Sequence, residues 1–146
     1  MPRTKLEEQP GYEFAHTLTI RVTDLNYGAH LANTAVVGLV HEARVQLLRE
    51  LGCSELNLGD DQTGLIIGDL VVNFRAEGFL GDDLRIESHI GEISRKSFRL
   101  FHRICRDNEL VALVETGLVT FDYSQRKAVP VPEIFRQSVK DFQENS

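Results

Sequence analysis

Four side chains with clear chemical potential lie in one short segment, TDLNYGAHLAN, at residues 23–33. Asp24 supplies a carboxylate, His30 an imidazole, and Asn26 and Asn33 supply amides. Carboxylates and imidazoles are the groups that most often move protons in enzymes. An apolar helix pattern begins directly afterwards, and the start of a helix presents free N–H groups and a partial positive charge. The segment is therefore either a loop that caps a helix or an active site at the positive end of that helix.

The elements on either side of this segment have different hydrophobic periods. Residues 13–23 alternate from His16 onward, which predicts a strand. Residues 34–51 repeat apolar side chains at spacings of three and four, which predicts a helix. The repeating positions are Val36, Val40, Ala43, Leu47 and Leu51. Asn33 suits the N-cap of this helix, and Gly52 suits the left-handed position just past its end.

The first half of the predicted helix, TAVVGLV, is apolar on all sides, which predicts burial on nearly all sides. Gly38 lies inside this half, where glycine destabilises a helix by roughly 1 kcal/mol relative to alanine. We expect another backbone to approach Gly38 closely, because a close approach would explain the missing side chain.

The rest of the chain predicts a meander of strands. Four strand-like runs lie at residues 63–75, 84–90, 98–104 and 110–121. Short turns join the last three, so we expect antiparallel pairing. A short helix is predicted near residues 133–142. One strand, one long helix and four strands give an α+β fold, with a five-stranded antiparallel sheet wrapped around a single helix.

Length and composition limit the class of protein. The chain has 146 residues and a net charge of −6 with no basic block, which disfavours nucleic acid or an anionic membrane as a partner. We expect a flexible N-terminal arm at residues 1–12 and one domain at residues 13–146. Cys53 and Cys105 make no disulfide framework, and no apolar run approaches membrane-spanning or signal-sequence character. These features predict a cytoplasmic protein.

The order of the motifs resembles the hotdog-fold acyl-CoA thioesterases of the 4-hydroxybenzoyl-CoA thioesterase type. That family typically carries a loop reading about D-x-D-x-x-G-H-x-N-N before a helix rich in F-E-x-A-R. Here Asp24, His30 and Asn33 match the first acid, the His and the last Asn of the loop without a gap. The later signatures are resembled by HEAR at residues 41–44, NFR at residues 73–75 and GD at residues 81–82. The similarity spans roughly residues 13–123.

The resemblance implies the hotdog fold and hydrolysis of an acyl-CoA or acyl-ACP thioester without a metal or cofactor. It implies that Asp24 serves as the base for water or as the nucleophile. His30 and Asn33 would position the thioester carbonyl or the water, and Asn26 would hold Asp24 in place. It also implies a homodimer or homotetramer in which sheets pair edge to edge and the acyl site lies between subunits.

Other residues are weaker candidates. Glu42 lies nine residues past Asn33, which is roughly 13 Å along a helix at ~1.5 Å per residue. It is either a helix carboxylate of the kind that some hotdog thioesterases use or a surface residue paired with Arg44 or Gln46. In the resembling family, basic residues near sheet edges meet the phosphates of CoA. Arg75, Arg95 and Lys96 are therefore candidate substrate-binding residues, although Arg95 and Lys96 also fit a solvated hairpin tip.

Several other chemistries lack their motifs. The sequence contains no G-x-S-x-G, no G-x-G-x-x-G or Walker loop, and no zinc-ligand spacing. Two alternatives stay open beside hydrolysis. The first is a hotdog protein that binds an acyl carrier or partner without turnover, because the family's second acid is Asn26 here and the first of its paired Asn residues is Ala32. The second is an enoyl-thioester hydratase, which the spacing of His30 from Asn26 disfavours.

Overall fold

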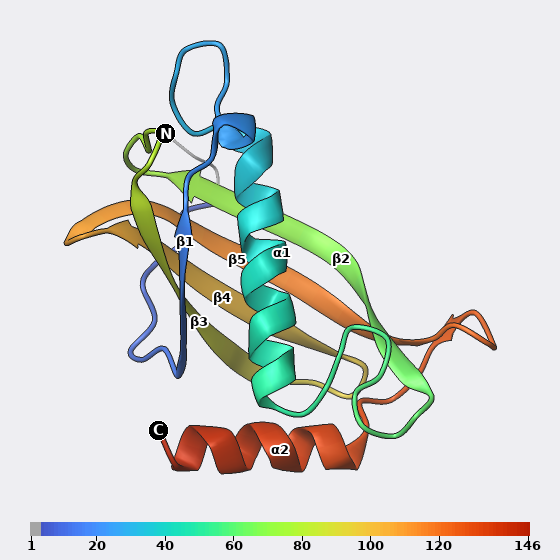
Figure 1. Ribbon diagram of the computed structural model, residues 1–146. Coiled ribbons are helices and arrows are strands. Elements are labelled where there is room, and N and C mark those ends of the chain that lie inside the picture. Colours follow the sequence, from blue (N-terminus) through green and yellow to red (C-terminus); the bar gives the residue numbers. More distant parts are fainter. Residues whose placement is uncertain (1–3) are drawn as a thin grey trace.

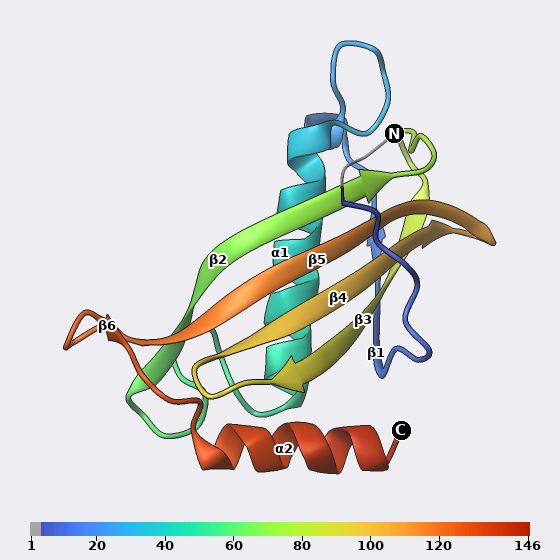
Figure 2. The ribbon, with the colours of Figure 1, turned by 180° about the vertical axis from the view of Figure 1, so that it is seen from behind.

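The computed structural model describes residues 4–146, which form one antiparallel sheet and two α-helices (Figures 1 and 2). The strands are β1 (Phe14–Thr19), β2 (Thr63–Phe74), β3 (Asp83–Ile93), β4 (Ser97–Arg106), β5 (Glu109–Asp122) and β6 (Lys127–Ala128). The helices are a short 3-10 helix η1 (Val22–Asp24), α1 (Asn33–Glu50) and α2 (Glu133–Glu144). The sheet order is β1-β3-β4-β5-β2, and β6 pairs with β5. The predicted α+β hotdog architecture, with a long helix on a five-strand antiparallel sheet, is confirmed.

The long helix α1 crosses one face of the sheet, as Figure 1 shows. Its buried side chains follow the predicted spacing and comprise Val36, Leu39, Val40, Ala43, Arg44, Leu47 and Leu48. The prediction that its first half is buried nearly all round is wrong for the single chain. Val37 is 42% exposed, and Gly38 is also exposed. Gly52 follows the helix at φ 74°, the left-handed conformation predicted for it.

Two predicted details are wrong, one at the end of β1 and one at the start of α1. The first strand ends at Thr19 rather than at residue 23, because the chain turns into η1. That turn is closed by the carboxylate of Asp24, which accepts a hydrogen bond from the backbone N–H of Arg21. The N-cap of α1 is Ala32, so Asn33 is the first helical residue and caps nothing.

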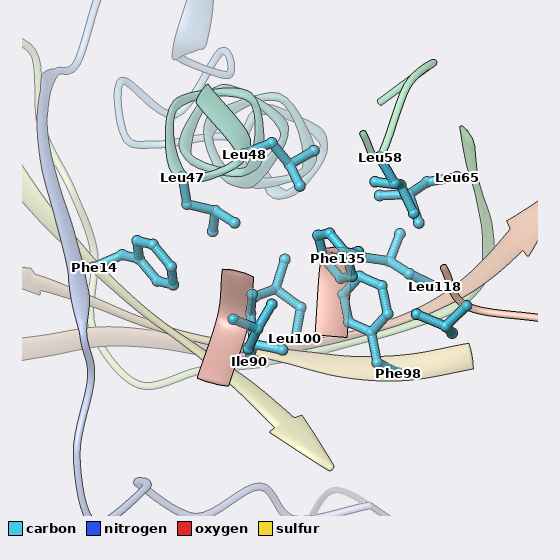
Figure 3. Packing of buried hydrophobic residues seen from close by; sticks show 12 residues of the cluster. Phe14, Leu47, Leu48, Leu58, Leu65, Ile90, Phe98, Leu100, Leu118 and Phe135 are labelled. Carbon is cyan, nitrogen blue, oxygen red and sulfur yellow. The ribbon is translucent and has the colours of Figure 1, made fainter. Parts of the chain in front are cut away.

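Two apolar clusters fill the space between α1 and the sheet. The cluster near the end of α1 includes Leu47 and Leu48, together with Phe135 of helix α2 (Figure 3). Helix α2 lies below the end of α1 in Figure 1 and closes the cluster there. The rings of Phe135 and Phe98 lie with centroids 5.4 Å apart. The cluster near the start of α1 includes Val36, Leu39, Val40, Leu84, Ile86 and Ile104. Burial of this kind contributes roughly 25 cal/mol per Å² of apolar surface, so both clusters hold α1 in place.

A buried polar pair lies between the two clusters. Ser88 on β3 faces His102 on β4, and the Ser88 Oγ lies 2.7 Å from His102 Nδ1. Burial, and secondarily the nearby Arg44 guanidinium, lowers the pKa of His102 to about 3. The imidazole is therefore neutral in the folded protein at ordinary pH. Arg44 itself is buried, and its Nε donates to Glu55 Oε2 at 3.0 Å.

Residues of the N-terminal segment lie on the outer face of the sheet. Leu6 is buried, and its backbone N–H donates to Asn73 Oδ1 at 2.6 Å. The Arg103 guanidinium lies over the Tyr12 ring, 4.4 Å from its centroid. No helix within residues 4–146 is long and apolar enough to cross a membrane.

We predict that acid destabilises the fold through His102. Between pH 6.5 and about 3 the unfolded chain binds a proton at this side chain and the folded chain does not, so the free energy of unfolding falls as the pH drops. The loss is on the order of 5 kcal/mol over the full range. Urea unfolding at pH 7 and pH 4 measures it.

The matched variant is His102→Gln, which keeps a partner for the Ser88 hydroxyl but cannot titrate. Its stability should depend less on pH than that of the wild type. NMR titration of the imidazole gives an independent test in the intact protein, and a His102 that protonates near pH 6 would contradict the account.

Candidate active site

An open groove of about 600 Å³ lies beside the first half of α1. The end of β1, η1 and the start of α1 form its walls. Its polar lining consists of Thr19, Arg21, Thr23, Asp24, Thr34 and Glu42. Its apolar lining consists of Leu18, Leu25, Ala32, Ala35, Gly38 and Leu39. The groove therefore combines two carboxylates and one guanidinium with a floor of small and apolar side chains.

Asp24 is fixed in this groove by bonds at both of its ends. Its backbone carbonyl accepts a hydrogen bond from Ala32 N at 2.9 Å, which joins η1 to the N-cap of α1. Its carboxylate accepts from Arg21 N at 2.9 Å and, through longer contacts of 3.3 and 3.4 Å, from the Arg21 guanidinium. The Asp24 side chain is only 9% exposed, whereas the Arg21 side chain is 74% exposed. The carboxylate is thus buried against the protein and held by a cation that faces solvent.

Arg21 sets the charge state of Asp24. Burial alone would raise the pKa of the carboxyl, but the hydrogen bonds from the Arg21 backbone and guanidinium outweigh it and lower the pKa below its usual value. The same contacts raise the pKa of Arg21. Asp24 is therefore an anion at neutral pH, ready to accept a proton or to attack a carbon.

The start of α1 lies in the same groove and has no side-chain cap. Ala32 occupies the N-cap with φ −72° and ψ 146°, and no side chain bonds to the first turn. The first four N–H groups of a helix have no i−4 partner inside the helix. Here Ala32 N donates to Asp24 O and Ala35 N to Ala32 O, which leaves the N–H groups of Asn33 and Thr34 without a partner among the described residues. They carry partial positive charge, so a carbonyl oxygen that gains negative charge is stabilised there. Thr34, in this first turn, lines the groove together with Asp24.

Glu42 lies two helical turns further along the same groove. It is exposed, and its carboxylate accepts a hydrogen bond from Gln46 Nε2 at 3.3 Å, as one sequence interpretation expected. The other expected partner, Arg44, is instead buried and bound to Glu55. Glu42 is thus a second carboxylate in the groove and is less firmly held than Asp24.

Asn26 and His30 belong to a separate loop. Asn26 Oδ1 accepts from Gly28 N at 2.8 Å, and its Nδ2 lies 3.5 Å from His30 Nδ1. The loop tip carries Tyr27, which is fully exposed. Asn26 contacts its own loop rather than the Asp24 carboxylate, so the structure gives no support to its predicted hold on Asp24. Neither Asn26, His30 nor the exposed Asn33 lines the groove.

The three basic candidates are divided between the two ends of the sheet. Arg75 follows β2 at the groove end, where its guanidinium donates to the Leu6 carbonyl at 3.2 Å. Arg95 and Lys96 lie in the β3–β4 turn at the other end, and their carbonyls accept from Val131 N and Thr120 N. Within one chain, the structure therefore does not bring Arg95 and Lys96 to Asp24.

Sequence reasoning missed Arg21 and the open surface at Gly38. The acid three residues after Arg21 was a possible signal for this turn, because an acid at the third position of a helix commonly binds the backbone N–H of the N-cap residue. Within residues 4–146, no group of three or more His, Cys, Asp or Glu side chains is arranged to hold a metal ion.

Comparison with known families decides the class of this protein. Residues 20–139 match the model of the Thioesterase-like superfamily. The chain belongs to the Thioesterase-like superfamily. The resemblance predicted from the loop and helix motifs is therefore confirmed, and so is the predicted class of enzyme, an acyl-thioester hydrolase. The roles of individual residues stay predictions.

Solved structures share the fold of this thioesterase-like protein. A 1,4-dihydroxy-2-naphthoyl-CoA thioesterase from Synechocystis is 20% identical with a TM-score of 0.79, over 89% of this chain and 97% of its own. A gentisyl-coenzyme A thioesterase is 21% identical with a TM-score of 0.77, over 86% and 99%. A Staphylococcus aureus protein in complex with CoA is 18% identical with a TM-score of 0.82, over 91% and 85%. No curated protein matches the chain in sequence.

We predict that Arg21→Gln raises the pKa of Asp24. The variant keeps the backbone N–H bond but loses the guanidinium, so the ionised carboxylate is less stabilised. A ¹³C NMR titration of the Asp24 carboxyl measures the change directly. Arg21→Lys keeps a cation and should give a smaller rise, while an Asp24 titration that is the same in all three proteins would contradict the assignment.

Proposed function

We propose that this protein hydrolyses an acyl-CoA thioester in the groove beside α1, with Asp24 as the base or nucleophile. One observation carries the proposal. An ionised, buried carboxylate and the uncapped start of a helix lie in one open groove. These are the two parts that thioester hydrolysis needs, because a thiolate leaves readily.

The geometry supports a simple reaction sequence. The thioester carbonyl oxygen accepts hydrogen bonds from backbone N–H groups at the start of α1. These bonds stabilise the negative charge that develops on the oxygen. Asp24 removes a proton from a water molecule as that water attacks the carbonyl carbon. The new C–O bond forms, the C–S bond breaks, and the proton held by Asp24 passes to the thiolate or to solvent. The products are a free acid and the CoA thiol.

The alternative covalent route uses the same groups. Asp24 attacks the carbonyl carbon itself, the thiolate leaves, and water then hydrolyses the resulting anhydride. Hydrolysis in ¹⁸O-labelled water under single-turnover conditions separates the two routes, because the anhydride route allows label to enter the Asp24 carboxylate.

The named relatives support CoA as the carrier. Two of them are thioesterases of aromatic acyl-CoA compounds, and a third was solved in complex with CoA. We therefore propose acyl-CoA rather than acyl-ACP as the substrate. A panel of acyl-CoA compounds with short, long and aromatic acyl groups, with detection of the released thiol, defines the acyl group.

A binding protein without turnover is the second candidate. It is favoured by the three hydrogen bonds between Arg21 and Asp24, because an acid held in this way also serves as a structural cap of η1. A wild type that binds acyl-CoA but releases no thiol from any member of the panel would favour this candidate.

We predict that Asp24→Asn lowers kcat/KM by about 100-fold or more, the usual contribution of a general base. The amide keeps the size of the side chain but cannot take a proton. Glu42→Gln is the matched control, because Glu42 lies in the same groove but about 12 Å along the helix from Thr34, at ~1.5 Å per residue. We expect Glu42→Gln to change kcat/KM less than fivefold, and the reverse order of effects would assign the base to Glu42.

We also propose a homodimer that pairs along β2, or a tetramer built from two such dimers. β2 is the last strand of the five-strand order, and no strand among the described residues pairs with its outer edge. The loop before β2 bonds to that edge only at its start, where Thr63 O accepts from Leu58 N and Leu65 N donates to Glu55 O. Its exposed apolar side chains are Ile66, Ile67, Leu70 and Phe74, and Val37 of α1 is exposed as well. A long apolar edge strand in water is an aggregation hazard unless another chain covers it.

Antiparallel pairing along β2 would also affect the site. Ser97 is level with Ile66, because both pair with Val119, so the β3–β4 turn lies at the Thr63 end of β2. Pairing about a two-fold axis would bring that end of the second copy toward the groove end of this chain. Arg95 and Lys96 would then approach the CoA phosphates from the second copy, and Arg75 from the same chain.

We predict a dimer or tetramer at micromolar concentration by size-exclusion chromatography with light scattering. Ile67→Lys should produce a monomer, since it places a charge on the proposed interface. Ile134→Lys is the control, because Ile134 is a similarly exposed apolar residue (54%) that lies on α2 rather than on β2. A monomeric wild type would contradict the dimer, and so would an Ile67→Lys variant with unchanged mass.

We propose a cytoplasmic location on the basis of the cysteines. Cys53 and Cys105 are both free and half-buried, and burial raises the pKa of both thiols. Thiols of this kind are typical of a reducing compartment.

A further inference from the structure

Gly38 occupies a helix position that the fold would fill better with another residue. It lies in the interior of α1, where glycine is less stable than alanine because its unfolded backbone has more freedom. Its φ is not in the left-handed region, so no backbone conformation here requires glycine. The reason for this glycine must lie in the space beside it.

That space is empty in the described chain. A Cβ built at Gly38 meets no atom within 4 Å, so the expected close approach of another backbone is wrong for residues 4–146. The helix is held to the sheet by other positions, among them Val36, Val40 and Ala43, all buried. Packing within the chain therefore does not need a glycine at position 38.

The empty space is part of the groove. Ala35 and Glu42, at i−3 and i+4 from Gly38, line the groove with it, so the three form one strip along α1. Gly38 lies one helical turn past Thr34, where the carbonyl of the substrate would bind. The apolar side chains that line the groove include Leu18 and Leu39, and Leu39 is next to Gly38 in the chain. A group that extends from the carbonyl along the helix would thus meet small and apolar surfaces.

We propose that Gly38 sets the width of the acyl site and so selects the acyl group. The absent side chain lets a broad acyl group lie directly against the α1 backbone between Thr34 and Glu42. The inference rests on the proposed function for the location of the carbonyl. It goes further in assigning the Gly38 stretch of the groove to the acyl group rather than to the pantetheine arm.

The test compares the wild type with Gly38→Ala and Gly38→Val. Binding is measured by calorimetry with two unreactive ketone analogues, phenacyl-CoA and acetonyl-CoA, which have the same CoA moiety but a broad or a small acyl group. We expect the valine variant to bind phenacyl-CoA at least tenfold more weakly than the wild type does, and the alanine variant to be intermediate. Binding of acetonyl-CoA should change less than threefold in both.

Thermal stability provides a second readout, because Gly38→Ala should weaken phenacyl-CoA binding but stabilise the fold. Gly38→Ala should raise the Tm by about 2–4 °C, because alanine favours the helix over glycine and meets no clash. Arg49→Val is the control for a branched side chain on α1. Arg49 is exposed on the last turn, outside the groove, and the variant should leave both analogues binding as in the wild type.

Three results would overturn the inference. The first is unchanged phenacyl-CoA binding in Gly38→Val. The second is an equal loss for both analogues, which would assign this surface to the pantetheine arm. The third is a molecular mass of either Gly38 variant in light scattering that differs from that of the wild type, which would make Gly38 a contact between copies. A wild type that binds phenacyl-CoA but cleaves no acyl-CoA would refute the proposed function alone, whereas a wild type that binds neither analogue would refute this inference too.

Discussion

The two-ended attachment of Asp24 is the interaction on which the site depends. Its backbone carbonyl is bonded to Ala32 at the N-cap of α1, and its carboxylate is bonded to Arg21, two residues past the end of β1. The same residue therefore sets where the helix begins relative to the sheet and where the acid points. Because α1 is packed on the sheet along its length, the acid and the helix start keep a fixed relation. Such preorganisation allows a few weak dipoles to stabilise a developing charge.

The arrangement also explains why the start of α1 lacks a side-chain cap. A Ser, Thr, Asp or Asn at the N-cap would satisfy one free N–H group and stabilise the helix by about 1 kcal/mol. Ala32, which lines the groove, offers no side-chain bond to that group. Together with Gly38, it makes α1 less stable locally than its packing would allow. Both departures from good helix design lie on the groove side, while the buried side of α1 follows the ordinary rules.

Much of the fold could be predicted from the sequence, because hydrophobic periodicity reports burial directly. The period of two in β3 and β4 and the spacing of Val36, Val40, Ala43 and Leu47 in α1 predicted all three elements correctly. The end of β1 was predicted four residues too late, since the alternation of residues 20–23 does not reveal the Arg21–Asp24 turn. The exposed face of α1 was also missed, because an apolar residue such as Val37 gives the same signal whether its own chain or a second copy covers it.

The candidate site was predicted less completely than the fold. Asp24 lies in the groove as the motif suggested, but Asn26 and His30 bond within their own loop. Spacing along a chain does not determine which way a loop of this length folds back. The separation of Arg95 and Lys96 from Asp24 is likewise a matter of sheet register, which depends on pairings between residues far apart in sequence. A single sequence carries no direct signal for either.

A crystal structure with bound phenacyl-CoA is the most direct test of the central claim. The account predicts that the ketone oxygen lies about 3 Å from backbone N–H groups in the first turn of α1, with the Asp24 carboxylate beside the ketone carbon. A ketone oxygen directed to solvent, or an acyl group bound outside the groove that Asp24 lines, would contradict it.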